Sequence, residues 1–391
     1  MLVNYAYKFR LYPNKEQRVL LEKHFGTTRY IWNYFLNKRQ DDYLKNKEDI
    51  EAKKIKSSAS YYNDAKHLTQ LKKEVGKEWI NETNSQSLQS TLKYLELAYT
   101  RFFKKIADFP SFKKKKNKQS FTIPQFLTIE QGKIIFPKFR DGIKVKSHRE
   151  VEGRIVVSTL SKNTAGQYYI SIITEREVNT LPANDNKIGV DVGIKDFAVC
   201  SNGKRFENPK YLIKKERKLK RIQRSLSRKK KGSNNRNKMR LLLSKLHNKV
   251  TNSRKEFHHQ ISHKITSENQ AIVIEDIQVK NLMKNHKLAK HITDVAWGQF
   301  INQLEYKSKW RDRTIIKIDR FYPSSKTCNN CNYIYEGLTL KMRSWVCPEC
   351  KSELDRDYNA SLNILKQGLL KFCSAVGTTV ESLGSCCIGN S

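Results

Sequence analysis

The chain has 391 residues, and its 76 Lys and Arg residues against 38 Asp and Glu residues give a formal net charge of +38. A charge of this size disfavours compaction unless a polyanion neutralises it, so nucleic acid is a better partner than a membrane surface. The apolar runs are too short for a membrane-spanning helix, and the N-terminus lacks the apolar block of a signal peptide. We therefore expect a protein that neither spans a membrane nor is secreted.

The first half of the chain is predicted to contain one strand, then helices, then several short strands. Residues 1–12 alternate as a half-buried strand does, and Asn14 followed by Gln17 is a capping-box pattern that starts a helix. A helical pattern continues to Lys105, and the strand patterns "FTIPQFLTIEQGKIIFP", "GRIVVSTL" and "SKNTAGQYYISIIT" follow, with turn residues between them. These strands predict a small β-barrel or sandwich that the first strand completes, with the helices inserted between.

The second half is predicted to form a separate α/β domain. Its apolar strand patterns are "IGVDV", "FAVC", "AIVIED" and "TIIKID", and a very basic helical region, 211–265, lies between the first two and the last two. Short apolar strands joined by helices indicate a central sheet that is covered on both faces. The final "GTTVESLGSCCIGNS" is poor in charge and rich in Gly and Ser, so we expect it to be disordered.

Four of the eight cysteines form two close pairs, "CNNC" and "CPEC", with fifteen residues between them. Each pair can place two thiolates on one knuckle, and two knuckles complete the tetrahedron of a structural zinc ribbon. The alternative, a redox dithiol, needs one such pair at a helix start rather than two. The sequence therefore predicts a zinc site formed by Cys328, Cys331, Cys347 and Cys350.

One carboxylate lies in the middle of an apolar strand, in "KIGVDVGIKDFAV". The period of two of a strand places Asp191 on one face between Gly189 and Gly193. A charge with no side chain on either side suits the approach of a bulky anion through a metal ion. A strand-end Asp beside Gly is also a common turn residue, so this pattern alone leaves both interpretations open.

Two further acids lie at the ends of predicted elements. Glu275 ends the apolar strand in "AIVIED", and Asp357 precedes the helical run in "LDRDYNASLNIL", where an Asp also commonly caps a helix. The neighbouring acids Asp276 and Asp355 are the alternatives to Glu275 and Asp357 for such a role. Three carboxylates from three elements of one sheet would form a hard oxygen site for Mg²⁺, and two such ions can cleave a phosphodiester.

The basic segment 214–231 contains a single acid, Glu216, so pairing within the helix does not explain its charge. A solvated surface remains one explanation, and phosphate contact is the one we prefer. The residues of this segment that we expect to contact nucleic acid are Lys214, Arg217, Lys218, Arg221, Arg224 and Arg228.

Four motifs, in order along the chain, resemble those of the TnpB (OrfB) proteins of insertion sequences. They are "GVDVGIKDFAV", "IVIEDIQVKNL", "FYPSSKTCNNC" with "CPEC", and "DRDYNASLNIL". The opening "YKFRLYPNKEQ" is also similar to that family, so the resemblance covers nearly the whole chain except its tail. Members of that family are transposon-encoded, RNA-guided DNA endonucleases related to the type V CRISPR effectors.

The resemblance implies an α/β RNase H-like (RuvC-type) nuclease domain with an inserted zinc ribbon. A β-barrel wedge domain that carries a helical recognition insert would precede it. The boundaries that we assign are 1–12 and 119–183 for the wedge domain, 13–118 for the helical recognition domain, 184–323 and 352–370 for the nuclease domain, 324–351 for the zinc ribbon and 371–391 for a disordered tail.

The resemblance also implies roles for individual residues. The catalytic Asp, Glu and Asp of the family fall on Asp191, Glu275 and Asp357, which would bind two Mg²⁺ ions, with Mn²⁺ as a substitute. We prefer Asp357 to Asp355 because it directly precedes "YNASLNIL". The glycines beside Asp191 would then leave space for a scissile phosphate.

By the same analogy, the N-terminal domains hold the RNA and a short DNA motif beside the target. The expected contacts there are the basic run "KKKKNK" and Tyr5, Tyr7, Lys8 and Arg10. The aromatic members of this set could equally belong to the core of the barrel.

These interpretations predict an RNA-guided, Mg²⁺-dependent DNA endonuclease of a transposon. A guide RNA derived from the transposon end would pair with double-stranded target DNA after the protein checks a short flanking motif. We expect a monomer bound to RNA in the bacterial or archaeal cytosol or nucleoid. The alternatives are a transposase, a guide-independent RNase H-like nuclease or junction resolvase, and a non-catalytic RNA-guided repressor, against which the three acids argue.

Overall fold

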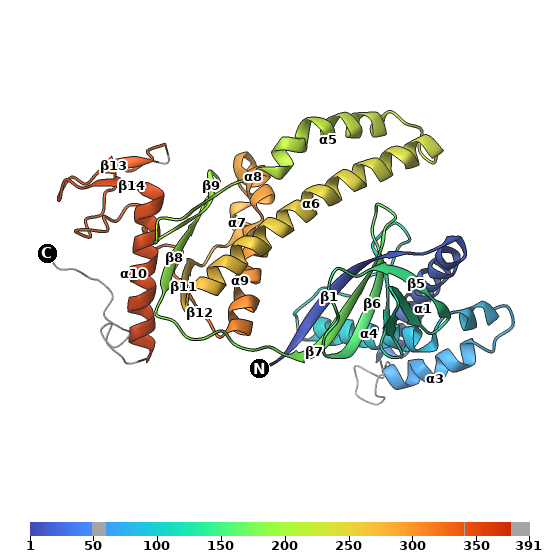
Figure 1. Cartoon of the computed structure of the whole chain (residues 1–391). Coiled ribbons are helices and arrows are strands. Elements are labelled where there is room, and N and C mark those ends of the chain that lie inside the picture. The colour runs from blue at the N-terminus through green and yellow to red at the C-terminus, as the bar shows by residue number, and fades with distance from the viewer. Residues whose placement is uncertain (49–59, 340, 377–391) are drawn as a thin grey trace. The chain divides into compact units, whose positions relative to one another are not determined.

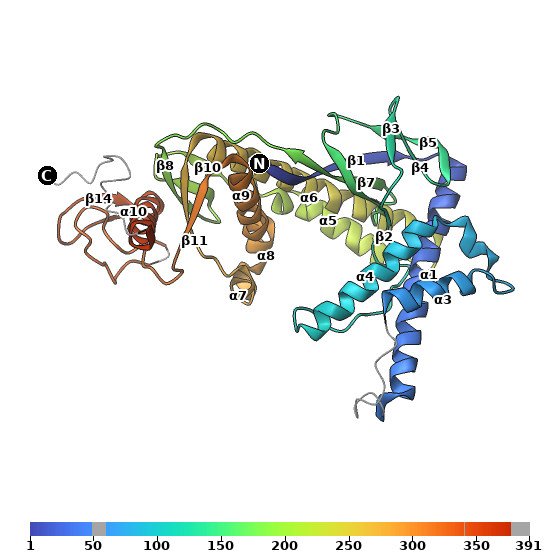
Figure 2. The same ribbon diagram turned by 90° about the horizontal axis from the view of Figure 1, so that it is seen from below.

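The computed structural model describes residues 1–48, 60–339 and 341–376. Its internal contacts divide the chain into two units, of which one is Leu2–Glu177 and the other is Met1 together with Val178–Ser391 (Figures 1 and 2). Each unit has its own hydrophobic core.

The unit Leu2–Glu177 contains a seven-stranded antiparallel sheet and a group of helices. The sheet has the order β2-β6-β7-β1-β5-β4-β3, so the N-terminal strand β1 (Leu2–Tyr12) lies between β7 (Tyr168–Glu177) and β5 (Phe139–Lys146). Strands from both ends of this order contribute to one core, which means that the sheet curls around it. The remaining strands are β2 (Gln119–Ile123), β3 (Thr128–Glu130), β4 (Lys133–Phe136) and β6 (Arg154–Lys162).

Helices fill the interval between β1 and β2. Helix α1 (Lys15–Lys45) begins at the predicted capping box: Asn14 Oδ1 accepts the backbone N–H of Gln17 at 2.8 Å, and Gln17 Oε1 accepts that of Asn14 at 3.1 Å. The first turns of α1 pack into the core of the curled sheet, and its later turns pack into a second, helical core. The other helices are α3 (Tyr61–Leu71), the 3₁₀ helix η1 (Glu78–Glu82) and α4 (Ser85–Phe103).

The second unit is built on a five-stranded mixed sheet with the order β10-β9-β8-β11-β12. The central strand β8 pairs antiparallel with β9 and parallel with β11, and β11 pairs parallel with β12. The four predicted strands are therefore present, with a short fifth strand at one edge. Their bounds are β8 (Lys187–Val192), β9 (Asp196–Cys200), β10 (Arg205–Glu207), β11 (Ala271–Glu275) and β12 (Thr314–Ile318).

Helices cover both faces of this sheet, as the sequence predicts. Residues such as Val190 and Ile274 pack with α6, α8 and α9 on one face, whereas Val273 and Ile316 pack with α10 on the other (Figure 1). No helix in the described part of the chain is long and apolar enough to cross a membrane. The helices are α5 (Tyr211–Ser227), α6 (Asn234–Glu268), α7 (Val279–Leu282), α8 (His286–Val295), α9 (Trp297–Arg311) and α10 (Arg356–Val376).

A small hairpin of β13 (Ser344–Val346) and β14 (Glu353–Asp355) leads directly into α10. Because α10 extends to Val376, residues 371–376 are helical, and the predicted boundary of a disordered tail at 371 is wrong. The apolar side chains of Phe372 and buried Cys373 explain the difference, since they continue the packed face of the helix. The rest of that predicted tail, 377–391, lies outside the described residues.

Two glycines allow α10 to lie close against the strands. A Cβ atom on Gly189 of β8 would be 2.1 Å from the backbone oxygen of Ser361, and one on Gly368 of α10 would be 2.2 Å from Val273 Cγ1. Real Cβ atoms are not found this close to other heavy atoms, so a side chain at either position would push the helix and the sheet apart.

We expect Gly368→Ala to destabilise the second unit. Overpacking against Val273 costs about 1–3 kcal/mol, which exceeds the roughly 1 kcal/mol that Ala gains over Gly in a helix. Gly298→Ala in α9 is the matched control, because its Cβ would meet only Val279 Cγ2, at 3.9 Å. Thermal unfolding should show a lower Tm for the first variant and an equal or higher Tm for the second. An equal Tm for both would contradict this account of the packing.

Candidate active site and metal centre

The three predicted acids come from three neighbouring elements of the second unit. Asp191 lies near the end of β8, Glu275 ends β11, and Asp357 is in the first turn of α10. The parallel register pairs Val190 with Ile274, so Asp191 and Glu275 are the next residues on adjacent strands. Residues at matched positions of parallel strands point to the same face, and here it is the face that α10 covers.

The packing of α10 brings Asp357 to the same place. Ser361, one turn after Asp357, lies against Gly189, and Gly189 is two residues before Asp191 on the same face of β8. One turn of helix and two residues of strand have similar lengths, about 6 Å, so Asp357 lies over Asp191. Repulsion between Asp191 and both other carboxylates agrees with this arrangement.

The glycines beside Asp191 have a different role from the expected one. The space next to Gly189 is occupied by the α10 backbone, not left open for a phosphate. Gly193 lies in the turn to β9, where its N–H donates to the Phe197 carbonyl at 3.2 Å and a Cβ would be 2.8 Å from the Asp196 carbonyl. The expectation that these glycines make room for substrate is therefore wrong. They make room for the protein's own backbone.

Negative charge accumulates at this point of the fold. Although Asp191 is not fully shielded from solvent, burial and repulsion from Glu275 and Asp357 raise its pKa to about 8, and Arg356 offsets this only partly. Burial also raises the pKa of Glu275, and a hydrogen bond from Ser324 opposes that rise. Asp191 therefore lies where a negative charge is unfavourable.

Ser324 fixes the Glu275 side chain. Its hydroxyl donates to Glu275 Oε1 at 2.6 Å, and its own carbonyl accepts the Asn363 side-chain N–H at 2.8 Å. Asn363 and Asn359, one turn apart on α10, also both donate to the Thr327 carbonyl, at 2.6 and 2.7 Å. Sequence reasoning assigned no role to these residues. Two Asn residues four positions apart in "YNASLNIL", and therefore on one face of the helix, were the available signal.

The structure also separates Asp357 from its neighbour Asp355. Asp355 Oδ1 accepts the backbone N–H of Tyr358 at 2.8 Å and an Arg205 N–H at 2.8 Å, so Asp355 caps α10. Burial would raise the pKa of Asp355, but the hydrogen bonds from Tyr358, Arg205 and the Asp357 backbone outweigh it and hold that pKa below its usual range. The capping role considered for Asp357 thus falls to Asp355.

The four predicted cysteines form one cluster, and their sulfur atoms all lie within 4.8 Å of one another. Cys328 and Cys350 have Sγ atoms 3.6 Å apart, as do Cys331 and Cys347, which is too long for a disulfide. Four thiolates at 2.3 Å from a central zinc would be about 3.8 Å apart. Hydrogen bonds from the side chain and backbone of Ser352 lower the pKa of Cys350 to about 6, which favours the thiolate.

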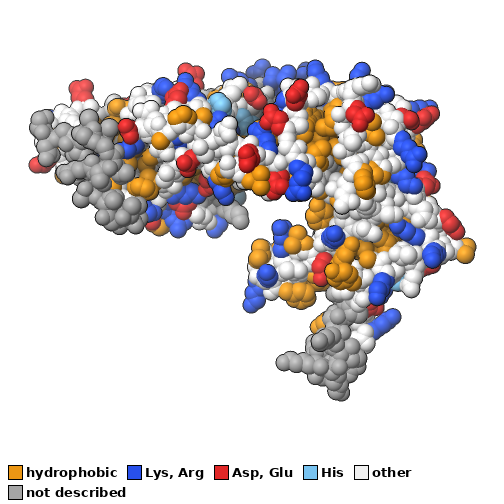
Figure 3. Space-filling view, turned by 60° about the horizontal axis from the view of Figure 1, so that its bottom comes forward, with side chains coloured by type: hydrophobic (Ala, Val, Ile, Leu, Met, Phe, Trp, Pro, Cys, Tyr) orange, Lys and Arg blue, Asp and Glu red, His pale blue; other side chains and the backbone are white. Residues whose placement is uncertain are grey.

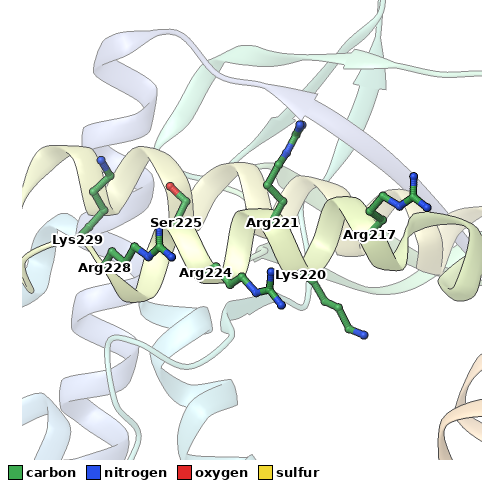
Figure 4. A pocket seen from close by; sticks show the side chains of 7 residues that line it. All are labelled: Arg217, Lys220, Arg221, Arg224, Ser225, Arg228 and Lys229. Atoms are coloured by element: carbon green, nitrogen blue, oxygen red, sulfur yellow. The ribbon is translucent and has the colours of Figure 1, made fainter.

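Helix α5 separates its charges from its apolar side chains. At 100° per residue, Arg217, Arg221, Arg224 and Arg228 share one face, and the buried Leu219 and Ile222 lie opposite against α6. Side chains of the basic face surround a hollow of about 760 Å³ (Figure 4). Lys214 and Lys218 are exposed too, and the hollow adds Lys220 and Lys229, which sequence reasoning did not single out.

The acid within this segment is neutralised locally. Glu216 accepts hydrogen bonds from Lys220 at 2.8 Å and Lys290 at 2.5 Å, and these two partners lower its pKa to about 2. The stripe of four arginines therefore keeps its full charge.

The four N-terminal candidates do not share one environment. Lys8 and Arg10 are exposed on the outer face of β1, with Arg10 opposite Lys146 of β5. Tyr7 is only 2% exposed in the core, where its hydroxyl accepts an N–H of Arg176 at 3.1 Å, and Tyr5 is half-buried. Tyr7 is therefore a core residue of the first unit in this structure.

The "KKKKNK" run is partly engaged with the protein itself. Lys113 is exposed overall, but its Nζ lies over the Trp32 ring, 3.8 Å from the ring centroid. The following three lysines are exposed.

Three family models match successive parts of the chain. The OrfB_IS605 model, described as "Probable transposase", matches residues 171–286, and the "Cas12f1-like, TNB domain" model matches 297–364. A model described as "Helix-turn-helix domain" matches 1–48, where the structure forms β1 and α1.

Similar proteins match almost the whole chain. A protein of Streptomyces pristinaespiralis named "Putative RNA-guided DNA endonuclease" is 34% identical over 94% of this chain and 90% of its own length. The Escherichia coli K12 protein InsQ, which has the same name, is 30% identical over 93% of this chain and 92% of its own length. The chain therefore also has close to the full length of these relatives.

One solved structure shares the fold. It is described as "Cryo-EM structure of the Cas12f1-sgRNA-target DNA complex", and its protein matches with a TM-score of 0.53 at 13% identity, over 93% of this chain and 98% of that one. The order of the acids and cysteines, the matching family models and the full-length relatives agree, and this chain belongs to the TnpB (OrfB) family of insertion-sequence proteins.

Proposed function

We propose that this protein is an RNA-guided DNA endonuclease of a transposon, and that Asp191, Glu275 and Asp357 form its phosphodiester-hydrolysing site. The observation that carries this proposal is the placement of the three carboxylates at one edge of the mixed sheet, where Asp191 is repelled by both Glu275 and Asp357. The names of the two relatives support guidance by RNA and action on DNA. A central strand between antiparallel and parallel neighbours supports an RNase H-like, RuvC-type domain.

The donor set of this site fits Mg²⁺. Carboxylate oxygens are the ligands that Mg²⁺ prefers, and divalent cations would offset the repulsion of Asp191 by Glu275 and Asp357. Two Mg²⁺ ions, or Mn²⁺ in their place, would offset the charge of the phosphodiester and make an attacking water more acidic. Hydrolysis would then proceed without a covalent enzyme intermediate.

The residues of the chain would hold this site in position. Ser324 fixes the rotation of the Glu275 carboxylate through Oε1. Arg343 and Arg356 lie 3.3 and 3.9 Å from the Asp357 carboxylate and hold it at the start of α10. Asp191 would carry a proton below about pH 8 and release it when a cation binds.

The cysteine cluster fits a structural zinc ion, because all four ligands are sulfur and none of the four positions is left for water. The first knuckle is joined to α10 by a hydrogen bond from the Asn329 backbone to Asn359 at 2.9 Å. A zinc ribbon would therefore stabilise the segment that carries Ser324. The domain boundaries and the wedge and recognition roles of the first unit remain our predictions.

Guide RNA and double-stranded target DNA are the proposed partners, contacted through phosphates. The arginine stripe of α5 is about 17 Å long, which corresponds to about five base pairs of a duplex. Lys8 and Arg10 on β1 would add contacts in the other unit, where Arg10 opposite Lys146 places two like charges together. A short flanking DNA motif would be checked in the first unit.

We expect Asp191→Asn to abolish cutting while RNA binding persists. Asn has the shape of the protonated Asp but cannot bind a cation as a carboxylate does, so cleavage should fall by about 10²–10⁴-fold. The measurement is cleavage of a matched linear duplex in Mg²⁺ by protein purified with its RNA. Asp276→Asn, beside Glu275, is the control and should cut normally. Full cleavage by Asp191→Asn, or strand transfer without RNA, would refute the proposal.

Stability without divalent cations should depend on pH through Asp191. The native pKa of Asp191, about 8, lies above the unfolded value of about 4. The stability that this group contributes is therefore fully present below pH 4 and is lost as the pH rises through 8. The Tm of Asp191→Asn should therefore exceed that of the wild type by more at pH 8 than at pH 5. Mg²⁺ should remove this difference. A pH-independent difference would contradict the assigned environment.

Removing two charges from the α5 stripe should weaken binding in a salt-dependent way. For Arg221→Gln/Arg228→Gln, the slope of log K against log salt for matched target DNA should become shallower by about 2, because each phosphate contact contributes about 0.9. Lys23→Gln/Lys77→Gln changes the net charge equally, but these lysines pair with Glu82 and Glu74. An equal change of slope in both variants would show that only net charge matters.

A further inference from the structure

The turn that follows β12 passes beside the candidate active site. Ile318, the last residue of β12, pairs with Glu275, and Ser324 donates a hydrogen bond to Glu275. Phe321 is three residues from each of them. Because a chain extends at most about 3.6 Å per residue, the Cα atom of Phe321 lies within about 11 Å of the Cα atoms of Ile318 and Ser324, the two residues that contact Glu275.

Within this turn, Phe321 is held outward. Asp319 Oδ1 accepts the backbone N–H of Phe321 at 2.7 Å, and the Asp319 carbonyl accepts that of Tyr322 at 3.3 Å, so the turn has a fixed shape. Tyr322 packs against the apolar cluster beneath α10, whereas Phe321 is 81% exposed. The ring of Phe321 is therefore held at the surface by an ordered turn, where a ligand can reach its face.

A cavity of about 390 Å³ lies beside this ring. Its walls combine aromatic and apolar surface with hydrogen-bonding groups: Ile318, Asp319, Phe321, Tyr322, Gln367 and Lys371. The guanidinium of Arg320 lies over the Phe321 ring, 5.1 Å from its centroid. Aromatic surface, amide and carboxylate groups, and nearby cations suit a planar ligand with polar edges that is attached to phosphates.

We propose that Phe321 stacks on an unpaired nucleobase of the DNA strand that enters the carboxylate site, with the edge of the base in the adjoining cavity. The inference rests on the proposed function, because a strand held at the carboxylate site would reach this turn a few nucleotides from the scissile phosphate: Gln367 lies ten residues, about 15 Å, along α10 from Asp357. The base must be unpaired and unstacked from its neighbour, since the faces of bases inside a duplex are covered. The strand at the site is therefore single-stranded.

Binding of single-stranded DNA tests this inference without cleavage. The probe is a short oligonucleotide with one 2-aminopurine, whose fluorescence falls on stacking, bound to the full-length Asp191→Asn protein so that nothing is cut. Adding Phe321→Ala should weaken binding by about five- to a hundredfold, the usual effect of losing one stacking ring, and should remove part of the quenching. Adding Phe321→Trp should restore both.

Two controls separate stacking from other effects. Phe126→Ala removes a ring that is 72% exposed in the other unit and should leave binding unchanged. Full rescue by Phe321→Leu would overturn the proposal in favour of simple apolar contact. An equal loss of affinity for a blunt duplex would overturn it as well, because a duplex offers no unpaired base.

The outcomes also distinguish this inference from the proposed function. If the wild type cuts a matched target and Phe321→Ala cuts and binds equally well, the base site is refuted and the endonuclease stands. If the wild type does not cut but Phe321→Ala still loses affinity for the oligonucleotide, the base site stands and the proposed endonuclease activity fails.

Discussion

The close packing of α10 against β8 and β11 is the contact on which the candidate active site depends. The helix can reach the strands only because Gly189 and Gly368 have no side chains where their backbones meet Ser361 and Val273. This contact sets the height of α10 above the sheet, and with it the position of Asp357 over Asp191. A residue far from the chemistry, Gly368, thus helps to define the spacing of the carboxylates.

That packing has an electrostatic cost. Burial of Asp191, together with repulsion from Glu275 and Asp357 that Arg356 offsets only partly, raises the pKa of Asp191 to about 8. A fold that needed only stability would replace such a group with an apolar or neutral side chain. The hydrogen bond from Ser324 stabilises the Glu275 carboxylate in this position and only partly offsets the effect of its burial. A site maintained against its own repulsion is typical of one that is completed by cations.

Much of the architecture could be predicted from the sequence, because the signals were local. The alternation in "KIGVDV" predicted that Asp191 and the buried Val190 lie on opposite faces of one strand. The Asn14 capping box predicted the start of α1, and the spacing of the cysteine pairs predicted their cluster. Each depends on residues close together in the chain.

The features that were missed depend on contacts between distant segments. Strand β5 has the sequence "FRDGIKVK", whose Gly and charges hide its alternation, and only its pairing with β1 and β4 defines it. Gly189 was interpreted as open space because nothing in the sequence indicates that Ser361 lies above it. The roles of Ser324 and Asn363 likewise exist only once α10 and the first zinc knuckle have met.

One short segment joins these elements. Between Ile318 and Cys328 the chain leaves the sheet, exposes Phe321, contacts Glu275 through Ser324 and enters the cysteine cluster. Its near end is fixed by strand pairing, and its far end is held by Asn359 and Asn363 of the same helix that carries Asp357. Any displacement of the cysteine cluster would therefore act on Glu275 through fewer than ten residues. The proposed zinc ion, although it has no open coordination position for chemistry, would in this way help to position Glu275, one of the three proposed catalytic carboxylates.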